Sequence, residues 1–236
     1  MNILIVEDDA VHRAFLSEVL ARTMPGCDLV EAENGVVGEK LAQEHGTLHA
    51  VVDLQMPQRT GVDLARALWA RRPNTSIVFW SNYADEAYVR GVSRIVPGGA
   101  AYGYILKSAS EERLALALRG VFLEGQCIID REIRSVQQRS VDRSESFTDV
   151  EYEILTDLAL GLTDRLIAER RGLSLRSVQN RLQQIYDKLG VYDAQGGTEV
   201  FNLRMRAVAL ALLRKALNRE SLEQAEATLQ DWLKRR

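Results

Sequence analysis

The chain has 236 residues, of which 46% are hydrophobic and 27% are charged, and its formal net charge is −3. This length exceeds the usual single domain of about 100 to 150 residues, so two domains are expected. The composition excludes a disordered or collagen-like chain, and the apolar runs are far shorter than the roughly 20 residues that span a bilayer. Since the N-terminus begins with a strand-like run instead of a signal peptide, we expect a cytoplasmic protein with no membrane partner.

Charge is distributed unevenly along the chain. Residues 1–130 hold 12 Lys and Arg against 17 Asp and Glu, a balance of −5, whereas residues 161–190 hold 6 against 3, a balance of +3. A basic segment favours contact with nucleic acid and an acidic one disfavours it. The two cysteines, Cys27 and Cys127, lie far apart in apolar surroundings and are expected to be free thiols.

The first half of the chain alternates strand-like and helix-like segments. Short apolar or β-branched runs occupy residues 2–6, 28–32, 50–53, 77–80 and 102–106, and stretches with helical spacing separate them. This alternation predicts a doubly wound α/β domain over residues 1–122, with a five-stranded parallel sheet and right-handed crossovers. In such folds the functional site lies beyond the carboxyl ends of the strands.

Polar residues stand at four of these predicted strand ends. In chain order they are Glu7, Asp8 and Asp9, then Asp53, then Ser81, and then Lys107. Carboxylates that converge on one point repel one another unless a cation lies between them, and Mg²⁺ is the expected ion. A carboxylate nucleophile beside a metal ion, a lysine and a serine suits phosphoryl transfer to Asp53 as an acyl phosphate. A phosphohydrolase of similar fold is an alternative with the same acid cluster.

Residues 1–122 resemble the receiver domain of two-component response regulators. The matching segments are ILIVEDD at 3–9, VVDLQMP at 51–57, FWS at 79–81 and YILK at 104–107. The resemblance implies that Asp53 accepts a phosphoryl group from a sensor histidine kinase. It also implies that Glu7, Asp8, Asp53 and the backbone carbonyl of Gln55 hold Mg²⁺ or Mn²⁺, that Ser81 and Lys107 contact the phosphoryl group, and that Tyr104 is a switch. Such a protein assists only its own phosphorylation and dephosphorylation and is not otherwise an enzyme.

Two segments of this half depart from a simple receiver. The stretch between Ser81 and Lys107 is longer than the resemblance leads us to expect, because Pro97, Gly98 and Gly99 lengthen the connection before the last strand. Residues 123–146 are predicted to be a linker, since residues 131–146 are rich in Arg, Gln and Ser and poor in large apolar side chains.

Residues 161–191 predict two short helices joined by a tight turn. Thr163 and Ser174 are placed to cap the two helices, and Gly172 is placed to end the first in the left-handed conformation. The second helix has an apolar stripe of Val178, Leu182, Ile185 and Leu189, and an outward face of Arg176, Gln179, Asn180 and Gln183. This is how a protein presents a helix to a DNA groove. A helical hairpin that only packs on a neighbour is the alternative.

Residues 147–191, from FTDVEYEILTDLALGLTDRLIA to VQNRLQQIYDKLGV, resemble the helix-turn-helix of the NarL/FixJ, or LuxR-type, class. Thr148 and Glu151 have the spacing of a capping box. The all-α domain is predicted over 147–218, with residues 204–218 as its last helix. The expected DNA contacts are Arg176, Ser177, Gln179, Asn180, Arg181, Gln183 and Lys188. Amide side chains pair with adenine, so an operator containing A·T pairs is expected, while the cations meet phosphates.

Residues 219–236 predict one further amphipathic helix beyond that domain. Ser221 and Gln224 have capping-box spacing, and the apolar stripe consists of Leu222, Ala225, Leu229, Trp232 and Leu233. Two interpretations stay open: the stripe packs on the helices of its own chain, or it forms a dimer contact.

Together these patterns predict a transcription regulator that binds double-stranded DNA as a homodimer when Asp53 is phosphorylated. The alternative is a DNA-binding regulator whose intact receiver is controlled by oligomerisation, a ligand or a protein partner instead of phosphorylation.

Overall fold

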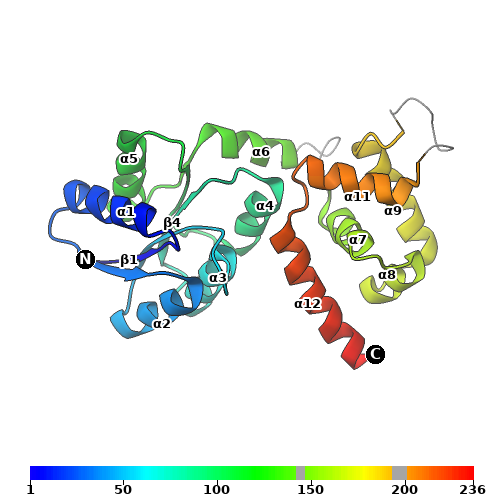
Figure 1. Cartoon of the computed structure of the whole chain (residues 1–236), viewed down its shortest axis with the longest axis horizontal. Helices are drawn as coiled ribbons and strands as arrows, with labels where there is room; N and C mark the ends of the chain where they lie inside the picture. The colour runs from blue at the N-terminus through cyan, green and yellow to red at the C-terminus, as the bar shows by residue number, and fades with distance from the viewer. Residues whose placement is uncertain (142–146, 193–200) are drawn as a thin grey trace. The chain divides into compact units, whose positions relative to one another are not determined.

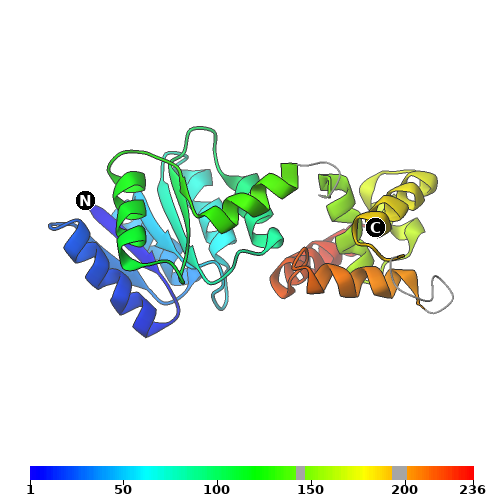
Figure 2. The ribbon, with the colours of Figure 1, turned by 90° about the horizontal axis from the view of Figure 1, so that it is seen from above.

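The computed structural model describes residues 1–141, 147–192 and 201–236 (Figures 1 and 2). The chain forms two compact units: residues 1–84 and 88–135 make the first, residues 85–87 and 136–236 make the second, and the main boundary falls between Ser135 and Val136. This division falls inside the segment predicted to be a linker.

The first unit is built on one parallel sheet. Its strands are β1 (Asn2–Val6), β2 (Asp28–Ala32), β3 (His49–Val52), β4 (Ser76–Ser81), β5 (Tyr102–Leu106) and β6 (Ile128–Ile129). Their spatial order is β2-β1-β3-β4-β5-β6, and all paired neighbours are parallel. The predicted doubly wound fold is confirmed, but the sheet has six strands and not five. Two residues are too short for a strand periodicity, so the sequence pattern did not reveal β6.

Helices cover both faces of this sheet. Helices α1 (Ala10–Thr23) and α5 (Glu111–Phe122) contact each other on one face, and α2 (Gly35–His45) and α3 (Gly61–Arg71) contact each other on the other (Figure 1). Helix α4 (Glu86–Ile95) follows β4. Every residue of β4 is buried, because a parallel sheet covered on both faces has no solvent side. This explains why the strands read as continuous apolar runs.

Helix α6 (Arg131–Val141) occupies much of the segment predicted to be a linker. The backbone carbonyl of Asp130 accepts the bond from Arg134 N that starts the helix, and Ile133 is fully buried. The segment 131–135 thus has a single buried apolar side chain among polar ones, which is too weak a stripe for the composition to indicate a helix.

In its described part the second unit is all helical, as predicted. Its helices are α7 (Asp149–Ala159), α8 (Asp164–Arg171), α9 (Leu175–Lys188), α11 (Leu203–Leu213) and α12 (Arg219–Arg235). The predicted caps are confirmed: Thr148 forms a capping box, Thr163 and Ser174 accept backbone bonds, and Gly172 ends α8 at φ 64°. The apolar stripe of α9 is buried in the core of this unit.

The end of the last predicted domain helix is wrong. Helix α11 ends at Leu213 instead of residue 218, because Lys215 adopts a left-handed φ of 58° and Ala216 N turns back to donate to the Ala211 carbonyl. Leu217 is then buried in the core. Asn218 caps α12, where Ser221 was expected, and its side chain accepts from Ser221 N at 2.8 Å. Gly196 and Gly197, which the sequence predicts to lie in a loop, fall outside the described residues.

Helix α12 packs on its own unit. Leu229 is 6% exposed, and Leu222 and Trp232 pack against the same core, whereas Leu233 remains 42% exposed. The contacts of α12 with α7 fit the interpretation that the stripe is covered by helices of its own chain. Among the described helices, none combines the length and the apolar character needed to cross a membrane.

Candidate functional site

Three carboxylates meet at the carboxyl ends of β1 and β3. The backbone of Asp53 donates to the Val6 carbonyl at 2.9 Å, which aligns these two strand ends. One oxygen from each of Glu7, Asp8 and Asp53 then lies within 4.8 Å of the others. Glu7 and Asp53 are buried and Asp8 is exposed, so the cluster opens to solvent on one side.

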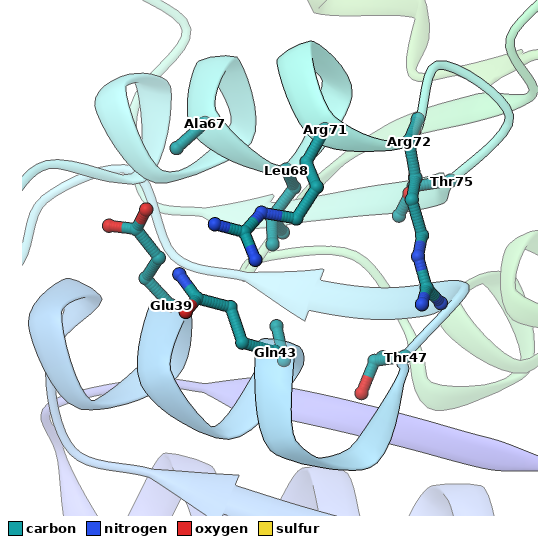
Figure 3. Close-up of a pocket in the computed structure, with 9 residues that line it drawn as sticks. Glu39, Gln43, Thr47, Ala67, Leu68, Arg71, Arg72 and Thr75 are labelled. Atoms are coloured by element: carbon teal, nitrogen blue, oxygen red, sulfur yellow. The ribbon is translucent and has the colours of Figure 1, made fainter.

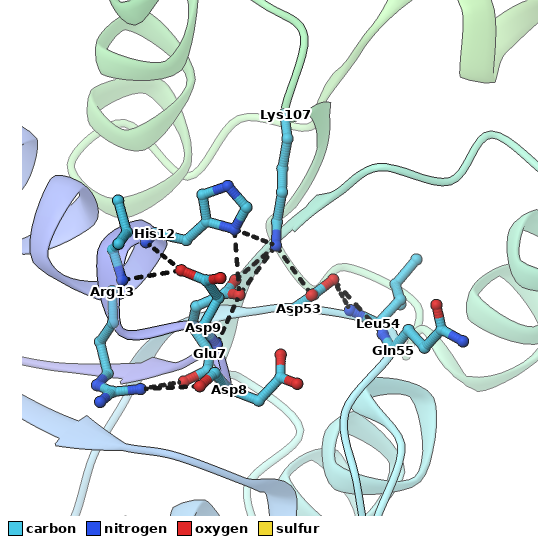
Figure 4. A network of polar contacts seen from close by, with 10 residues as sticks. Glu7, Asp8, Asp9, His12, Arg13, Asp53, Leu54, Gln55 and Lys107 are labelled. Carbon is cyan, nitrogen blue, oxygen red and sulfur yellow. Dashed lines mark hydrogen bonds and ion pairs between the residues drawn. The ribbon is translucent and has the colours of Figure 1, made fainter.

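Lys107 joins this cluster from the end of β5. Its Nζ lies 2.9 Å from Asp53 Oδ2 and 2.9 Å from both carboxylate oxygens of Glu7 (Figure 4). Burial lowers the pKa of Lys107, but the hydrogen bonds and charges of the two carboxylates raise it, and the net shift is upward. Lys107 is therefore held as a cation between two carboxylates.

The two carboxylates differ in what holds them. Burial raises the pKa of Glu7; the bond from Lys107 lowers it, the charge of Asp53 raises it, and the net shift is upward. At Asp53, Oδ1 accepts from Leu54 N at 2.6 Å, while Oδ2 faces Lys107. The backbone thus fixes the rotation of the Asp53 side chain.

Asp9 takes no part in the cluster. It caps α1, and its Oδ1 accepts from Val11 N at 2.8 Å and His12 N at 3.0 Å. Asp9 is also absent from the metal ligands that the resemblance implies. The carboxylates that remain, Glu7, Asp8 and Asp53, form an all-oxygen donor set of the kind that Mg²⁺ prefers, and the residues present fit such an ion.

Ser81 and Tyr104 extend the site along β4 and β5. Ser81 is fully buried at the end of β4, and among the described residues its Oγ has no hydrogen-bond partner. Lys107 N donates to the Ser81 carbonyl at 2.9 Å, so these two residues lie side by side. Tyr104 is fully buried, and its hydroxyl donates to the Tyr83 carbonyl at 2.7 Å.

A second candidate surface is the outward side of α9. Arg176, Gln179, Asn180 and Gln183 are exposed there, as predicted, and Ser177 and Arg181 are partly exposed. The Gln183 Oε1 accepts from the Tyr192 hydroxyl at 2.7 Å. The face thus presents guanidinium and amide groups, the side chains that read phosphates and base edges.

Comparison with known proteins identifies the family. The family model "Response regulator receiver domain" matches residues 3–119. The transcriptional regulatory protein YdfI of Bacillus subtilis strain 168 is 30% identical over 217 residues, which cover 89% of this chain and 98% of that protein. The chain belongs to the response regulators of the NarL/LuxR class. These are regulators of transcription and not classical enzymes.

Other relatives of this response regulator span both units. The DNA-binding transcriptional activator DevR/DosR of Mycobacterium tuberculosis is 28% identical over 202 residues, covering 81% of this chain and 89% of that protein. The solved structure of RcsB from Salmonella enterica serovar Typhimurium has a TM-score of 0.61 at 18% identity and covers 92% of this chain and 99% of that chain. At this identity the likeness to RcsB concerns the fold alone.

One predicted DNA contact, Lys188, points away from the outward side of α9. The side chain of Lys188 is only 13% exposed, and its Nζ donates to Glu151 Oε2 at 2.7 Å. Lys188 therefore points back towards α7 in this structure, and its contact with a DNA phosphate stays a prediction.

Sequence reasoning missed three neighbours of the acid cluster. His12 lies with its Nδ1 atom 3.3 Å from Lys107 Nζ. Arg13 donates to the Glu7 carbonyl at 2.7 Å, and Trp80 places its ring 5.1 Å from Lys107 Nζ. The signal that could have indicated His12 and Arg13 is that they occupy the first turn of the helix that starts at the acidic strand end.

The response regulator also has a cleft of about 390 Å³, counting its open mouth, between α2 and α3 (Figure 3). Gln43 and Thr47 line it from the side of α2, and Arg71 and Arg72 from the side of α3. None of its lining residues belongs to the acid cluster, so we assign the cleft no part in the chemistry at Asp53.

Proposed function

We propose that this response regulator accepts a phosphoryl group on Asp53 from a sensor histidine kinase and binds DNA through α9 to regulate transcription. The observation that carries the proposal is that Lys107 Nζ lies 2.9 Å from Glu7 Oε2 and 2.9 Å from Asp53 Oδ2. The three residues meet at the carboxyl ends of the parallel strands. This is the arrangement needed to bring a nucleophile and a cation to one phosphoryl group.

In the transfer, an oxygen of the Asp53 carboxylate attacks the phosphorus of a phosphohistidine. A P–O bond forms and the P–N bond breaks; the imidazole nitrogen leaves with that electron pair and takes a proton from solvent. Lys107 balances negative charge on the phosphoryl oxygens, and the unpartnered Ser81 hydroxyl donates to one of them.

Glu7, Asp8, Asp53 and the backbone carbonyl of Gln55 would hold Mg²⁺ or Mn²⁺ at this site. When bound, such an ion neutralises the phosphoryl oxygens and offsets the repulsion between the carboxylates. Leu54 N keeps Asp53 Oδ1 oriented throughout, which leaves Oδ2 on the side of Lys107.

The test is the intact mass of the full chain after incubation with phosphoramidate and Mg²⁺. We expect one added phosphoryl group in the wild type and none in Asp53→Ala. A folded wild type that gains no mass, yet binds DNA, would instead favour control by oligomerisation, a ligand or a protein partner.

For DNA recognition we propose that Gln179 and Asn180 read base edges and that Arg176 and Arg181 contact phosphates. Their exposure on α9 supports this assignment, as does the description of DevR/DosR as a DNA-binding activator. Amide side chains favour adenine, so the operator should contain A·T pairs. The bound form is a homodimer on two half-sites, and the protein acts in the cytoplasm.

Gel-shift titrations at two salt concentrations separate these roles. Arg176→Ala should weaken binding to all sequences and reduce the salt dependence, whereas Asn180→Ala should reduce the preference for the operator by about 10-fold. Lys40→Ala is the control, because it removes an exposed cation from α2 in the first unit, and it should leave the salt dependence unchanged. No salt-sensitive binding in any phosphorylation state would contradict the proposal.

A further inference from the structure

Among the described residues, the ammonium group of Lys107 has one close side-chain neighbour with a polar atom that is not a carboxylate. Besides Glu7 and Asp53, the Nδ1 atom of His12 lies 3.3 Å from Lys107 Nζ (Figure 4). A hydrogen bond from the ammonium to this atom requires the neutral imidazole with its proton on Nε2. Nδ1 also lies 3.6 Å from Glu7 Oε1, so the ring stands directly beside the cluster.

Two structural features fix the ring of His12 in this place. The first is the start of α1, where the Asp9 side chain accepts from His12 N at 3.0 Å and holds the first turn at the strand end. The second is Trp80, which is 3% exposed and meets the His12 ring edge-on at a centroid distance of 5.5 Å. Trp80 is itself stacked on Phe15 at 5.7 Å.

Trp80 and His12 together form the side of the Lys107 environment that carries no negative charge. Lys107 Nζ lies 5.1 Å from the Trp80 ring, within the range of a cation–π contact. A lysine ammonium has three N–H donors on a flexible four-carbon stem: Glu7 and Asp53 accept from it at 2.9 Å, and the Nδ1 atom of His12 lies within reach of a further N–H. Glu7 and Asp53 are also the proposed metal ligands, whereas His12 and Trp80 are not.

We propose that His12 is a positioning residue for Lys107. Its Nδ1 takes one N–H of the ammonium, and Trp80 packs edge-on against one side of the ring, so that another N–H is directed at Asp53 Oδ2 and at the phosphoryl group that Asp53 receives. This proposal rests on the proposed function, because it assigns His12 a part in the phosphorylation of Asp53.

The experiment compares single-turnover phosphorylation of the full chain by phosphoramidate and Mg²⁺ in three variants. His12→Leu removes the acceptor, His12→Gln restores one, and His45→Gln is the control at an exposed helix end. We expect His12→Leu to lower the maximal rate about 10-fold, with the phosphoramidate concentration at half-maximal rate changed less than about 2-fold. His12→Gln should recover most of the rate, and His45→Gln should match the wild type.

A lower maximal rate at a nearly unchanged half-saturating concentration, together with the rescue by glutamine, distinguishes a positioning role from a loss of folding. Equal rates for His12→Leu and wild type would overturn this inference alone. Glutamine as slow as leucine, with both variants folded by circular dichroism, would overturn it as well. A wild type that takes up no phosphoryl group would overturn the proposed function and this inference together.

Discussion

Glu151 is a single carboxylate that holds two different parts of the second unit. As the third residue of α7, its Oε2 accepts from Thr148 N at 2.6 Å and closes the capping box. The same oxygen accepts from Lys188 Nζ at 2.7 Å, which ties the end of α9 to the start of α7. Burial alone raises the pKa of Glu151, but the bonds from Lys188 and Thr148 outweigh it, and the pKa lies below the ordinary value of 4.5.

This lowered pKa predicts how stability depends on pH. Because the folded pKa is below the unfolded one, the contribution of Glu151 is fully present above pH 4.5 and is lost as the pH falls through the folded pKa. Glu151→Ala should lower the free energy of unfolding by about 1–3 kcal/mol at pH 7 and remove this part of the acid sensitivity.

The measurement is urea unfolding of the full chain, with hydrogen exchange of α7 peptides as the local readout, at pH 7 and pH 4. Glu223→Ala is the control, since its pair with Arg219 is exposed and should contribute less than about 0.5 kcal/mol. A Glu151→Ala protein that remains as acid-sensitive as the wild type would refute the assignment.

The acid cluster needs a glycine at position 61, and the sequence around Gly61 does not reveal this. It starts α3, and a Cβ built on it would collide with the Asp53 carbonyl oxygen and lie 2.8 Å from Leu54 Cα. Both are backbone atoms and cannot swing away. Gly61→Ala should therefore displace the Asp53 backbone, slow its phosphorylation at least about 10-fold, and cost about 1–3 kcal/mol in stability.

Mass uptake and thermal unfolding of this variant provide the check. Gly91→Ala is matched to it, because a Cβ at Gly91 would meet Val62 at an ordinary 3.6 Å. If the two alanine variants phosphorylate at the same rate, the contact at Gly61 does not position Asp53.

One buried carboxylate, that of Asp157, joins helix α7 to helix α8. Asp157 is fully buried and binds Arg170 Nη1 at 2.7 Å and Arg171 Nε at 2.6 Å. Arg170 also donates to Thr228 Oγ1 at 2.9 Å, which extends the junction to α12. Burial lowers the pKa of Arg171, but the bond and charge of Asp157 raise it, so that the net shift is upward.

Removing this carboxylate leaves two guanidinium groups without their buried partner. Asp157→Ala should cost about 3–5 kcal/mol, which is the range for breaking a buried ion pair. Asp231→Ala removes a comparable charge from an exposed pair with Lys234 and should change the stability by less than about 0.5 kcal/mol. Urea unfolding of the three proteins measures both effects, and equal midpoints would show that the junction contributes nothing.

Sequence reasoning succeeded for elements whose signal is local. Strand ends at Glu7, Asp53 and Lys107 follow from apolar runs, and the caps Thr163 and Ser174 follow from side chains that bond their own backbone neighbours. It failed where tertiary contacts decide. The inward turn of Lys188 depends on Glu151, which is 37 residues away, and the place of His12 depends on Lys107, which is 95 residues away.

In the second unit, α11 and α12 differ in how much of their apolar surface the core covers: Ala207 and Ala211 of α11 are fully buried, but other apolar side chains of that helix are not. The apolar stripe of α12 packs largely into the core, as the 6% exposure of Leu229 shows. Helix α11 instead exposes Met205 at 67%, Leu212 at 42% and Leu213 at 76%. Exposed apolar side chains grouped on one helix indicate an interaction surface, so a proposed homodimer should use α11 and not α12.

Two variants separate these helices, with sedimentation in the presence of operator DNA and urea unfolding as the measurements. Leu213→Glu should weaken dimerisation at least about 10-fold with little loss of stability, because it places a charge on a surface that must be desolvated. Leu229→Ala should lower stability by about 2–5 kcal/mol, the cost of a cavity in the core, and leave the dimer intact. The reverse result, a dimer lost in folded Leu229→Ala and kept in Leu213→Glu, would move the interface to α12. Packing and assembly would then share one helix, and the core contact of Leu229 would have to open for a second chain to bind.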